Sequence, residues 1–353
     1  MKFKINAWEI GRMMKTILKC TDSRNQAFGN VEISGDGQNL IMRSTNGSVN
    51  VEMRTPYMGL EETPYCVDAA MFGRVIGQCK GDVTVDLNER TCVVRGTGTT
   101  RIPVVTADIP KADRVKGATI EVSMDDFRRA YDGVAYAVAD QDSTRIVLTG
   151  ILAENDGSTA SLVALDGFVL AKEKMRCDGD AFKAVIPGNV MGLAAGGILD
   201  GKVKIVIGEG RCQILSDGMV ISSGLLNNAF PEYGRIIPET FKTECLVNVE
   251  ELRGALKAGN VINSRQNLVR IEIGENTLTV RNNGEEADYE AKIACVTQGE
   301  PLKIAFNQKY LMNTIAAIDT EEAVLRCNGA VSACVAHGKD RDGVHMVLPV
   351  RVM

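Results

Sequence analysis

The sequence predicts an α+β protein that consists of three copies of one unit, with two helices in each copy and strands outnumbering helices. Three observations lead to this prediction: one helix-start pattern occurs three times, a second lies midway between its copies, and strand-like stretches fill the intervals. With 353 residues, 45% of them hydrophobic, the chain is long enough for two or three ordinary globular cores.

The first helix-start pattern is a capping side chain, an acid three residues later, and an apolar residue directly after the acid. It occurs at Asn6–Ile10, Ser123–Phe127 and Asn248–Leu252, each time after a short extended stretch. The capping side chain accepts a hydrogen bond from a free backbone N–H of the first turn, while the acid reaches back toward the cap. We therefore expect a helix to begin at each of these positions.

The second pattern leads from an apolar strand into a helical stretch, at Cys66–Asp68, Ala184–Pro187 and Ile304–Asn307. The helices expected there span residues 69–79, 188–199 and 308–318. Both patterns recur at intervals of roughly 120 residues, which predicts domains at residues 1–118, 119–243 and 244–353. Residues 106–118 and 231–244, which contain proline and few long apolar runs, are the expected linkers.

Strands are expected wherever β-branched alternation is bounded by turn signals such as Asn46-Gly47 and Asn283-Gly284. These stretches are residues 39–43, 48–53, 83–87, 92–95, 161–165, 203–207, 269–273, 278–281 and 331–336. Two amphipathic helices cannot cover both faces of a sheet. We therefore expect the two helices of each copy to lie together on one face of antiparallel sheets.

Composition narrows the function classes. No stretch has the pattern of a secretory signal or a membrane span, so a cytoplasmic protein, associated with the nucleoid if it acts on DNA, is expected. The ten cysteines include no CxxC pair, which predicts buried thiols. A net charge of −5 argues against a surface that wraps nucleic acid on all sides, but it leaves a local basic face open.

Basic residues lie on or beside five of the six expected helices, and the fourth helix has none. Several acids of these helices fall in first turns, where the helix dipole favours them. Any single lysine or arginine of this kind can equally belong to a solvated helix face. The recurrence of basic residues on five helices favours a non-specific track for DNA phosphates. The residues concerned are Arg12, Lys15, Lys19, Arg74, Lys80, Arg128, Arg129, Arg253, Lys257 and Lys309.

The sequence contains no catalytic constellation. The two histidines, His337 and His345, lack partners at the spacing of a metal site or a catalytic triad. The glycine-rich stretch at 96–100 lacks the lysine of a phosphate-binding loop and leads into a strand-like stretch. We expect neither a catalytic residue nor a bound metal or cofactor.

Several motifs together resemble those of the bacterial DNA sliding clamps, the beta subunits of DNA polymerase III. Residues 163–171 (VALDGFVLA) resemble the central signature ATDGHRLA, residues 230–238 (FPEYGRIIP) are similar to the linker FPDYRRVIP, and residues 346–351 (MVLPVR) to the terminal VMPMR. Residues 145–150 and 306–311 match two further family motifs. All occur in family order over nearly the whole chain.

The resemblance implies three clamp domains per chain and a head-to-tail homodimer that closes into a ring of six domains. Such a ring encircles double-stranded DNA and slides without reading its sequence, because closure alone prevents dissociation. A clamp loader opens and loads it, and the DNA polymerase and repair proteins bind it through a short peptide motif. The family is not an enzyme.

The resemblance also implies a client pocket for an extended peptide that ends in leucine and phenylalanine. The signature's usual threonine, histidine and arginine are replaced here by Leu165, Phe168 and Val169, so the pocket is expected to be more apolar. The positions carried over are Leu148, Leu165, Gly167, Phe168, Val169, Leu170, Pro231, Arg235, Ile236, Met346, Leu348, Pro349, Val350 and Arg351.

Two more sets of positions follow from the resemblance. Arg24 and Gln141 correspond to residues that touch the duplex. Ring closure would pair Ile102 and Val104 with Val261 and Ile262, flanked by the acids Glu285, Glu286 and Asp288. Pro103 lies in the expected edge strand and removes one amide donor from it.

Two alternatives remain open from the sequence. One is an enzyme on a repeated α+β scaffold, which would need a convergent polar site. The other is an adaptor, for example of phage origin, that keeps the peptide pocket without stable ring closure.

Overall fold

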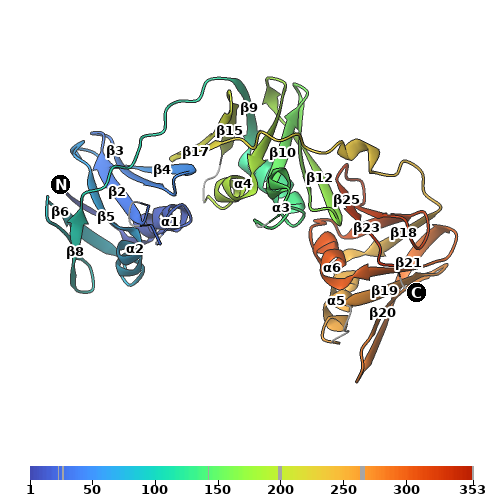
Figure 1. Cartoon of the computed structure of the whole chain (residues 1–353). Helices are drawn as coiled ribbons and strands as arrows, with labels where there is room; N and C mark the ends of the chain where they lie inside the picture. Colours follow the sequence, from blue (N-terminus) through green and yellow to red (C-terminus); the bar gives the residue numbers. More distant parts are fainter. Residues whose placement is uncertain (23, 26–27, 142, 198–200, 263–266, 352–353) are drawn as a thin grey trace. The chain divides into compact units, whose positions relative to one another are not determined.

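The computed structural model describes residues 1–353 except 23, 26–27, 142, 198–200, 263–266 and 352–353 (Figure 1). The chain forms two compact units. Unit 1 comprises Met1–Phe127, Cys177–Phe182 and Asn189–Leu225, and unit 2 comprises Arg128–Arg176, Lys183–Gly188 and Leu226–Met353.

Unit 1 contains the helices α1 (Ala7–Leu18) and α2 (Ala69–Gly77) and most of α4 (Gly188–Ala195). Helix α1 packs beside α2 and against β3 and β4. Among the described residues, the unit has one antiparallel sheet of thirteen strands, in the order β1 (Lys2–Asn6), β6 (Asp82–Leu87), β7 (Thr91–Arg95), β8 (Thr99–Val105), β5 (Tyr65–Asp68), β2 (Asn30–Gly35), β3 (Asn39–Thr45), β4 (Val49–Pro56), β17 (Met219–Gly224), β16 (Arg211–Ser216), β15 (Lys202–Ile207), β9 (Ala118–Ser123) and β13 (Asp178–Gly179).

Unit 2 contains the helices α5 (Val249–Gly259) and α6 (Gln308–Ala316) and the larger part of α3 (Met124–Ala135), with the short 3₁₀ turns η1 (Ile146–Thr149) and η2 (Tyr233–Arg235). Its described strands form one twelve-stranded sheet, in the order β14 (Phe182–Pro187), β10 (Gly150–Asn155), β11 (Thr159–Leu165), β12 (Val169–Arg176), β25 (Val344–Val347), β24 (Cys334–Gly338), β23 (Glu322–Cys327), β18 (Thr243–Asn248), β21 (Asp288–Gly299), β20 (Thr277–Asn283), β19 (Leu268–Ile273) and β22 (Leu302–Asn307).

The predicted repeat is present in the order of the elements. A strand leads directly into a helix three times in the first pattern (β1–α1, β9–α3, β18–α5) and three times in the second (β5–α2, β14–α4, β22–α6). Two strand pairings join neighbouring repeats: β4 with β17 in unit 1, and β12 with β25 in unit 2. Each sheet continues from one repeat into the next. The two compact units therefore do not coincide with the three repeats. The boundaries 1–118, 119–243 and 244–353 therefore stay a prediction.

The helices begin where the sequence predicts because polar side chains cap their first turns. Asn248 accepts from the N–H of Glu251 at 3.0 Å, and Ser123 accepts from the N–H of Asp126 at 3.1 Å. Asn6 caps α1 as well, but the predicted reach of Glu9 back toward the cap is wrong, because the Glu9 carboxylate accepts a hydrogen bond from the Thr55 hydroxyl instead.

Three helices end earlier than predicted. Helix α2 ends at Gly77 because the N–H groups of Gln78 and Cys79 donate to carbonyls three residues back, at 3.2 and 3.0 Å, which tightens the last turn. Helix α6 likewise ends at Ala316. Helix α4, predicted to span 188–199, ends at Ala195, where the N–H of Gly197 donates to the carbonyl of Ala194 at 3.2 Å in a turn; residues 198–200 lie outside the described residues.

The expected strand 331–336 begins three residues later, at Cys334. A turn occupies its predicted start: Gly329 has φ +134°, and the N–H of Ser332 donates to its carbonyl at 3.3 Å. Both expected linkers lack long elements. Residues 106–117 contain no helix or strand, and 231–242 contain only η2.

The cysteines are thiols, and all but the half-buried Cys79 are buried. Burial raises the pKa of the Cys20 and Cys66 thiols to about 11, so both stay protonated at neutral pH. None of the helices in the described ranges combines the length and the apolar character that a membrane crossing requires.

A buried ion network lies on β2, β3 and β4. Arg43, 8% exposed, donates to Glu32 at 2.7 Å and to Glu52 at 2.5 Å. Burial raises the pKa of the Glu52 carboxyl, but the hydrogen bonds from Arg43 and Arg54 outweigh burial and hold that pKa below its ordinary value. The network lies on the sheet face opposite α1, because the adjacent Ser44 donates to the carbonyl of Ile17 in α1.

We predict that Arg43→Leu lowers the free energy of unfolding by about 3 to 5 kcal/mol, because it leaves the buried Glu32 carboxylate without its cation and removes one of the two cations that hold the half-buried Glu52. Arg95→Leu is the matched control. Arg95 pairs with Asp86 at 3.3 Å but is 47% exposed, so its loss should cost at most about 1 kcal/mol. Urea denaturation of both variants measures the difference. Equal effects would contradict the assignment of the network as a structural one.

Candidate functional site

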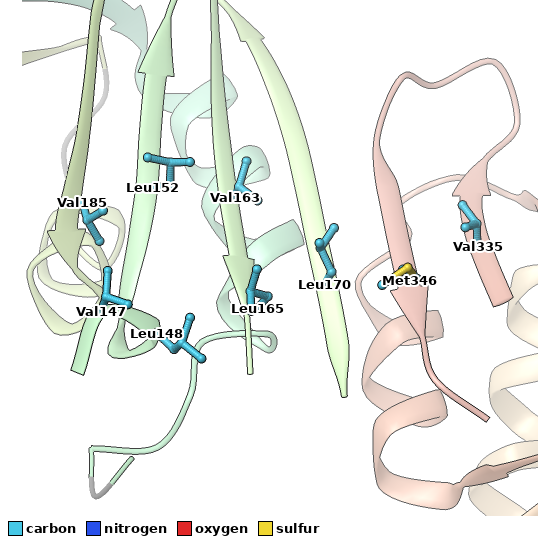
Figure 2. Packing of buried hydrophobic residues seen from close by; sticks show 9 residues of the cluster. All are labelled: Val147, Leu148, Leu152, Val163, Leu165, Leu170, Val185, Val335 and Met346. Carbon is cyan, nitrogen blue, oxygen red and sulfur yellow. The ribbon is translucent and has the colours of Figure 1, made fainter. Parts of the chain in front are cut away.

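An apolar cluster of nine buried side chains lies in unit 2 (Figure 2). Each member is at most 7% exposed, and the cluster draws on both neighbouring repeats. Leu170 on β12 and Met346 on β25 face each other across the paired strands. The full set is Val147, Leu148, Leu152, Val163, Leu165, Leu170, Val185, Val335 and Met346.

Four of the predicted pocket residues belong to this cluster: Leu148, Leu165, Leu170 and Met346. These four apolar positions are buried in the single chain, and their contact with a peptide stays a prediction. In this structure these four side chains pack into the interior of unit 2. Val169 is also buried, at 2% exposure, but it is not a member of the cluster.

Other predicted pocket residues lie at the surface. Phe168 is 56% exposed and Leu348 is 38% exposed, and we call these two side chains the apolar rim. The N–H of Leu348 donates to the carbonyl of Phe168 at 2.9 Å, which places the two residues side by side. The ring of Phe168 also stacks on Tyr310 of α6, with ring centroids 5.3 Å apart. The rim is therefore held by backbone and by ring contact.

Local backbone geometry explains why this turn presents Phe168. Gly167 has φ +102°, a conformation that side chains with a Cβ rarely adopt. Asp166 accepts from the N–H groups of Phe168 and Val169, at 2.7 and 2.9 Å. The Asp-Gly pair of the signature thus forms the turn that exposes the aromatic ring.

The C-terminal run is tied to a neighbouring strand. The N–H of Val350 donates to the carbonyl of Ala305 at 2.8 Å, and Pro349 forms a bridge with Phe306. Pro349 and Val350 are half-buried, and Arg351 is exposed. In the linker motif, Ile236 is 46% exposed, Arg235 is exposed and Pro231 is half-buried.

A hollow of about 400 Å³ opens beside the apolar cluster. Val147 of the cluster lines it together with Pro231, the one predicted pocket residue among its lining side chains. Ile146, which is 61% exposed, lines the same hollow. A hollow with an apolar wall beside a buried apolar floor suits an extended segment with apolar side chains.

Sequence reasoning missed two aromatic residues of the linker motif, Phe230 and Tyr233, which pack against the cluster. Lys172 donates to the Tyr233 hydroxyl at 3.0 Å and lies over its ring, 5.1 Å from the centroid, while that hydroxyl donates to Glu154. Burial and the Glu154 carboxylate raise the pKa of Tyr233. Both residues lie in the motif at 230–238, so this motif could have identified them as site residues from the sequence.

In unit 1 the predicted basic residues lie on α1, on α2 and just beyond their ends. Lys15, Lys19, Arg74 and Lys80 are exposed, and Arg12 is half-buried beneath the ring of Trp8, 5.2 Å from its centroid. Arg24, predicted to touch DNA, is exposed in the loop after α1 and pairs with Asp22 at 3.1 Å.

In unit 2 two predicted cations have partners within the fold. Arg253 donates to the carbonyls of Ala316 and Ile318 at 2.9 and 2.5 Å, and therefore stabilises the end of α6. Arg129 pairs with Glu173 at 3.2 Å. These contacts correct the expectation that both guanidinium groups are available for phosphates. The remaining predicted DNA-facing residues are the exposed Lys257, Lys309 and Gln141 and the half-buried Arg128.

The predicted ring-closure residues differ in exposure. Ile102 on β8 is 2% exposed, Val104 is half-buried, and Arg101 and Pro103 are exposed; their role in ring closure stays a prediction. Val261 is 80% exposed. It lines a hollow of about 350 Å³ in unit 2, together with Ile262, Gly284, Glu285, Glu286 and Ala287.

Within the described ranges, no group of three or more histidine, cysteine, aspartate and glutamate side chains is arranged to hold a metal ion. His345 is a buried structural side chain. Its Nε2 lies 3.1 Å from Glu173 and its Nδ1 3.3 Å from the Tyr136 hydroxyl. The other histidine, His337, contacts the carbonyl of Gly338 at 3.0 Å.

Comparison with known proteins gives consistent results. Residues 121–232 match the family model of the DNA polymerase III beta subunit central domain, and residues 234–351 match that of its C-terminal domain. The beta sliding clamps of Pseudomonas aeruginosa and Vibrio cholerae are 25% and 26% identical to the chain, over 92% of each sequence. A crystal structure of the Pseudomonas aeruginosa clamp bound to griselimycin superposes with a TM-score of 0.91 at 22% identity, covering 100% of both chains. The chain belongs to the family of DNA polymerase III beta subunits, the beta sliding clamps.

Proposed function

We propose that two copies of this chain close head to tail into a ring that encircles duplex DNA and tethers the replicative polymerase to it. The family is a non-catalytic subunit of the polymerase. The observation that carries the proposal is the match to the central and C-terminal domain models of the family, together with the repeated strand–helix architecture. A division into three domains at 1–118, 119–243 and 244–353 is part of the same proposal.

Two partly unpaired strands support ring closure. In unit 1, residues 99–103 of β8 pair with β7 on one side, while β5 pairs only with Val104 and Val105. In unit 2, residues 288–294 of β21 pair with β20, while β18 pairs with residues 295–299. Among the described residues, each strand therefore keeps one open edge, and pairing the two edges between subunits would complete both ladders.

Side-chain charge favours the same pairing. The open edge of β8 carries the exposed Arg101, and the open edge of β21 carries Asp288 and Glu290 with the neighbouring acids Glu285 and Glu286. Opposite charges favour a heterologous, head-to-tail contact over a contact between identical edges. Pro103 has no N–H to donate, so the ladder at this edge lacks one hydrogen bond.

Contacts with DNA in this proposal are ionic and sequence-independent. Exposed lysines and arginines of the helices would meet phosphates, which differ little from one base pair to the next. Weak contacts of this kind form and break as the ring moves, and the closed ring keeps the protein on the DNA. The residues proposed for these contacts are Lys15, Lys19, Arg24, Arg74, Lys80, Gln141, Lys257 and Lys309.

The proposed client site is the apolar rim, the hollow beside Pro231 and the buried cluster beneath them. Polymerase and repair proteins would each insert a short extended peptide here, with apolar side chains on the rim and in the hollow. A clamp loader would use the same site to open the ring. The greater apolar character of Phe168 and Leu165 would shift the peptide preference toward apolar residues.

We predict that the protein, once loaded by a clamp loader onto nicked circular DNA, leaves that DNA when the circle is cut. A closed ring slides off free ends, whereas a protein that binds phosphates without closure stays at low salt. Gel filtration of the DNA before and after cutting measures the retained protein. Retention after linearisation would refute the ring and favour the adaptor without stable closure.

We also predict that Phe168→Ala and Leu348→Ala each raise the Kd for a short peptide ending in leucine and phenylalanine by about tenfold or more. Loss of a large apolar side chain that the peptide buries costs on the order of 2 kcal/mol. Val296→Ala is the matched control, because Val296 is also in unit 2 and 60% exposed. Fluorescence anisotropy of a labelled peptide measures the change. Unchanged binding by both rim variants, with the fold intact, would remove the rim from the site.

A further inference from the structure

Trp8, the single tryptophan of the chain, is 69% exposed near the start of α1. Its indole ring has one face over the guanidinium of Arg12, 5.2 Å from the ring centroid. An exposed indole is costly in water, because it leaves a large apolar surface solvated. The exposed ring of Trp8 is therefore a candidate contact for a ligand that covers it.

A groove of about 550 Å³ lies beside Trp8 between α1 and α2. Met14, Leu18 and Ile76 line it together with Gly73 and Gly77, and a Cβ at Gly73 would lie 2.9 Å from the Leu18 side chain. A Cβ at Gly77 would meet no atom within 4 Å, so the groove is open at this point. Trp8 is itself one of the residues that line the groove.

The groove also has a positive charge. Arg12, Lys15 and Lys80 line it, and in the part of the chain that the structure describes none of the three lies within 4 Å of a carboxylate. The nearest acid along α1, Glu9, is held by the Thr55 hydroxyl. An aromatic ring with several cations beside it is the arrangement that binds single-stranded nucleic acid, in which a base stacks on the ring while cations meet the phosphates.

We infer that the groove between α1 and α2 binds single-stranded DNA, with one unpaired base stacked on Trp8. Duplex DNA does not offer this contact, because its bases already stack on one another and present phosphates and groove edges instead. The inference rests on the proposed function only in placing this helix pair beside DNA. The groove would add a contact that prefers an unpaired strand to a duplex. Such an unpaired strand lies next to the duplex beyond a primer terminus.

Intrinsic fluorescence gives a direct test, since all indole emission comes from Trp8. The full chain is titrated at low salt with an oligothymidylate of about twelve nucleotides and with a duplex of the same length. We expect the single strand to quench the emission and the duplex to quench it far less. The logarithm of the binding constant should fall with the logarithm of salt concentration with a slope of about −2, from three phosphate contacts. Equal quenching by both DNAs, or none, would overturn the inference.

Substitutions separate stacking from charge. Anisotropy of labelled oligothymidylate should show a Kd roughly five- to one-hundred-fold higher for Trp8→Leu, while Trp8→Tyr keeps most of the affinity because it keeps an aromatic face. Met58→Ala is the control, since Met58 is 77% exposed in unit 1 but does not line the groove, and it should bind as the native chain does. An unchanged Kd for Trp8→Leu contradicts the inference.

The outcome is separable from that of the proposed function. Binding of short oligonucleotides needs no loading, so quenching can be measured whether or not the protein forms a ring. If Trp8→Leu still slides off linearised DNA but binds the single strand as tightly as the native chain, the groove inference alone fails. If the native chain remains on linearised DNA, the ring proposal fails while the quenching result stands by itself.

Discussion

Two strand pairings across repeats are the interactions on which the rest of this structure depends. Strand β4 pairs with β17 over five residue pairs, from Met53 with Met219 to Val49 with Ser223, and β12 pairs with β25 over four. Each repeat would otherwise expose a row of unpaired backbone groups, which is a site for uncontrolled association. The pairings convert these edges into the interior of large sheets. Within the described ranges, residues 99–103 of β8 and 288–294 of β21 still have a partner strand on one side only.

The pairing of β12 with β25 also creates the candidate client site. It brings Met346 next to Leu170. The apolar cluster, which consists mainly of residues of the second repeat, thereby includes a side chain of the third repeat. A buried polar network reinforces the junction, because Glu173 on β12 contacts both His345 on β25 and Arg129 on α3, at 3.1 and 3.2 Å. The paired strands thus carry the apolar cluster and the polar contacts on the same short segment.

Glycines make room for this network. A Cβ at Gly133 would come within 2.5 Å of the Glu173 side chain, and one at Gly343 within 2.3 Å. Any larger residue at either place would displace the carboxylate from its two partners. The close approach of Glu173 to α3 and to the start of β25 therefore depends on glycine at these two positions.

The sequence by itself determined the helix starts, the repeat and the family, because each depends on neighbours within a few residues or on short motifs. Asn248 caps α5 through a residue three positions away, and Asp166-Gly167 forms the turn that exposes Phe168. Only the tertiary structure decided which way side chains point and what they meet. Arg253 contacts carbonyls more than sixty residues away, and Ile102 and Leu165 face cores. Alternation predicts two faces of a strand, but the packing of distant segments decides which of them is buried.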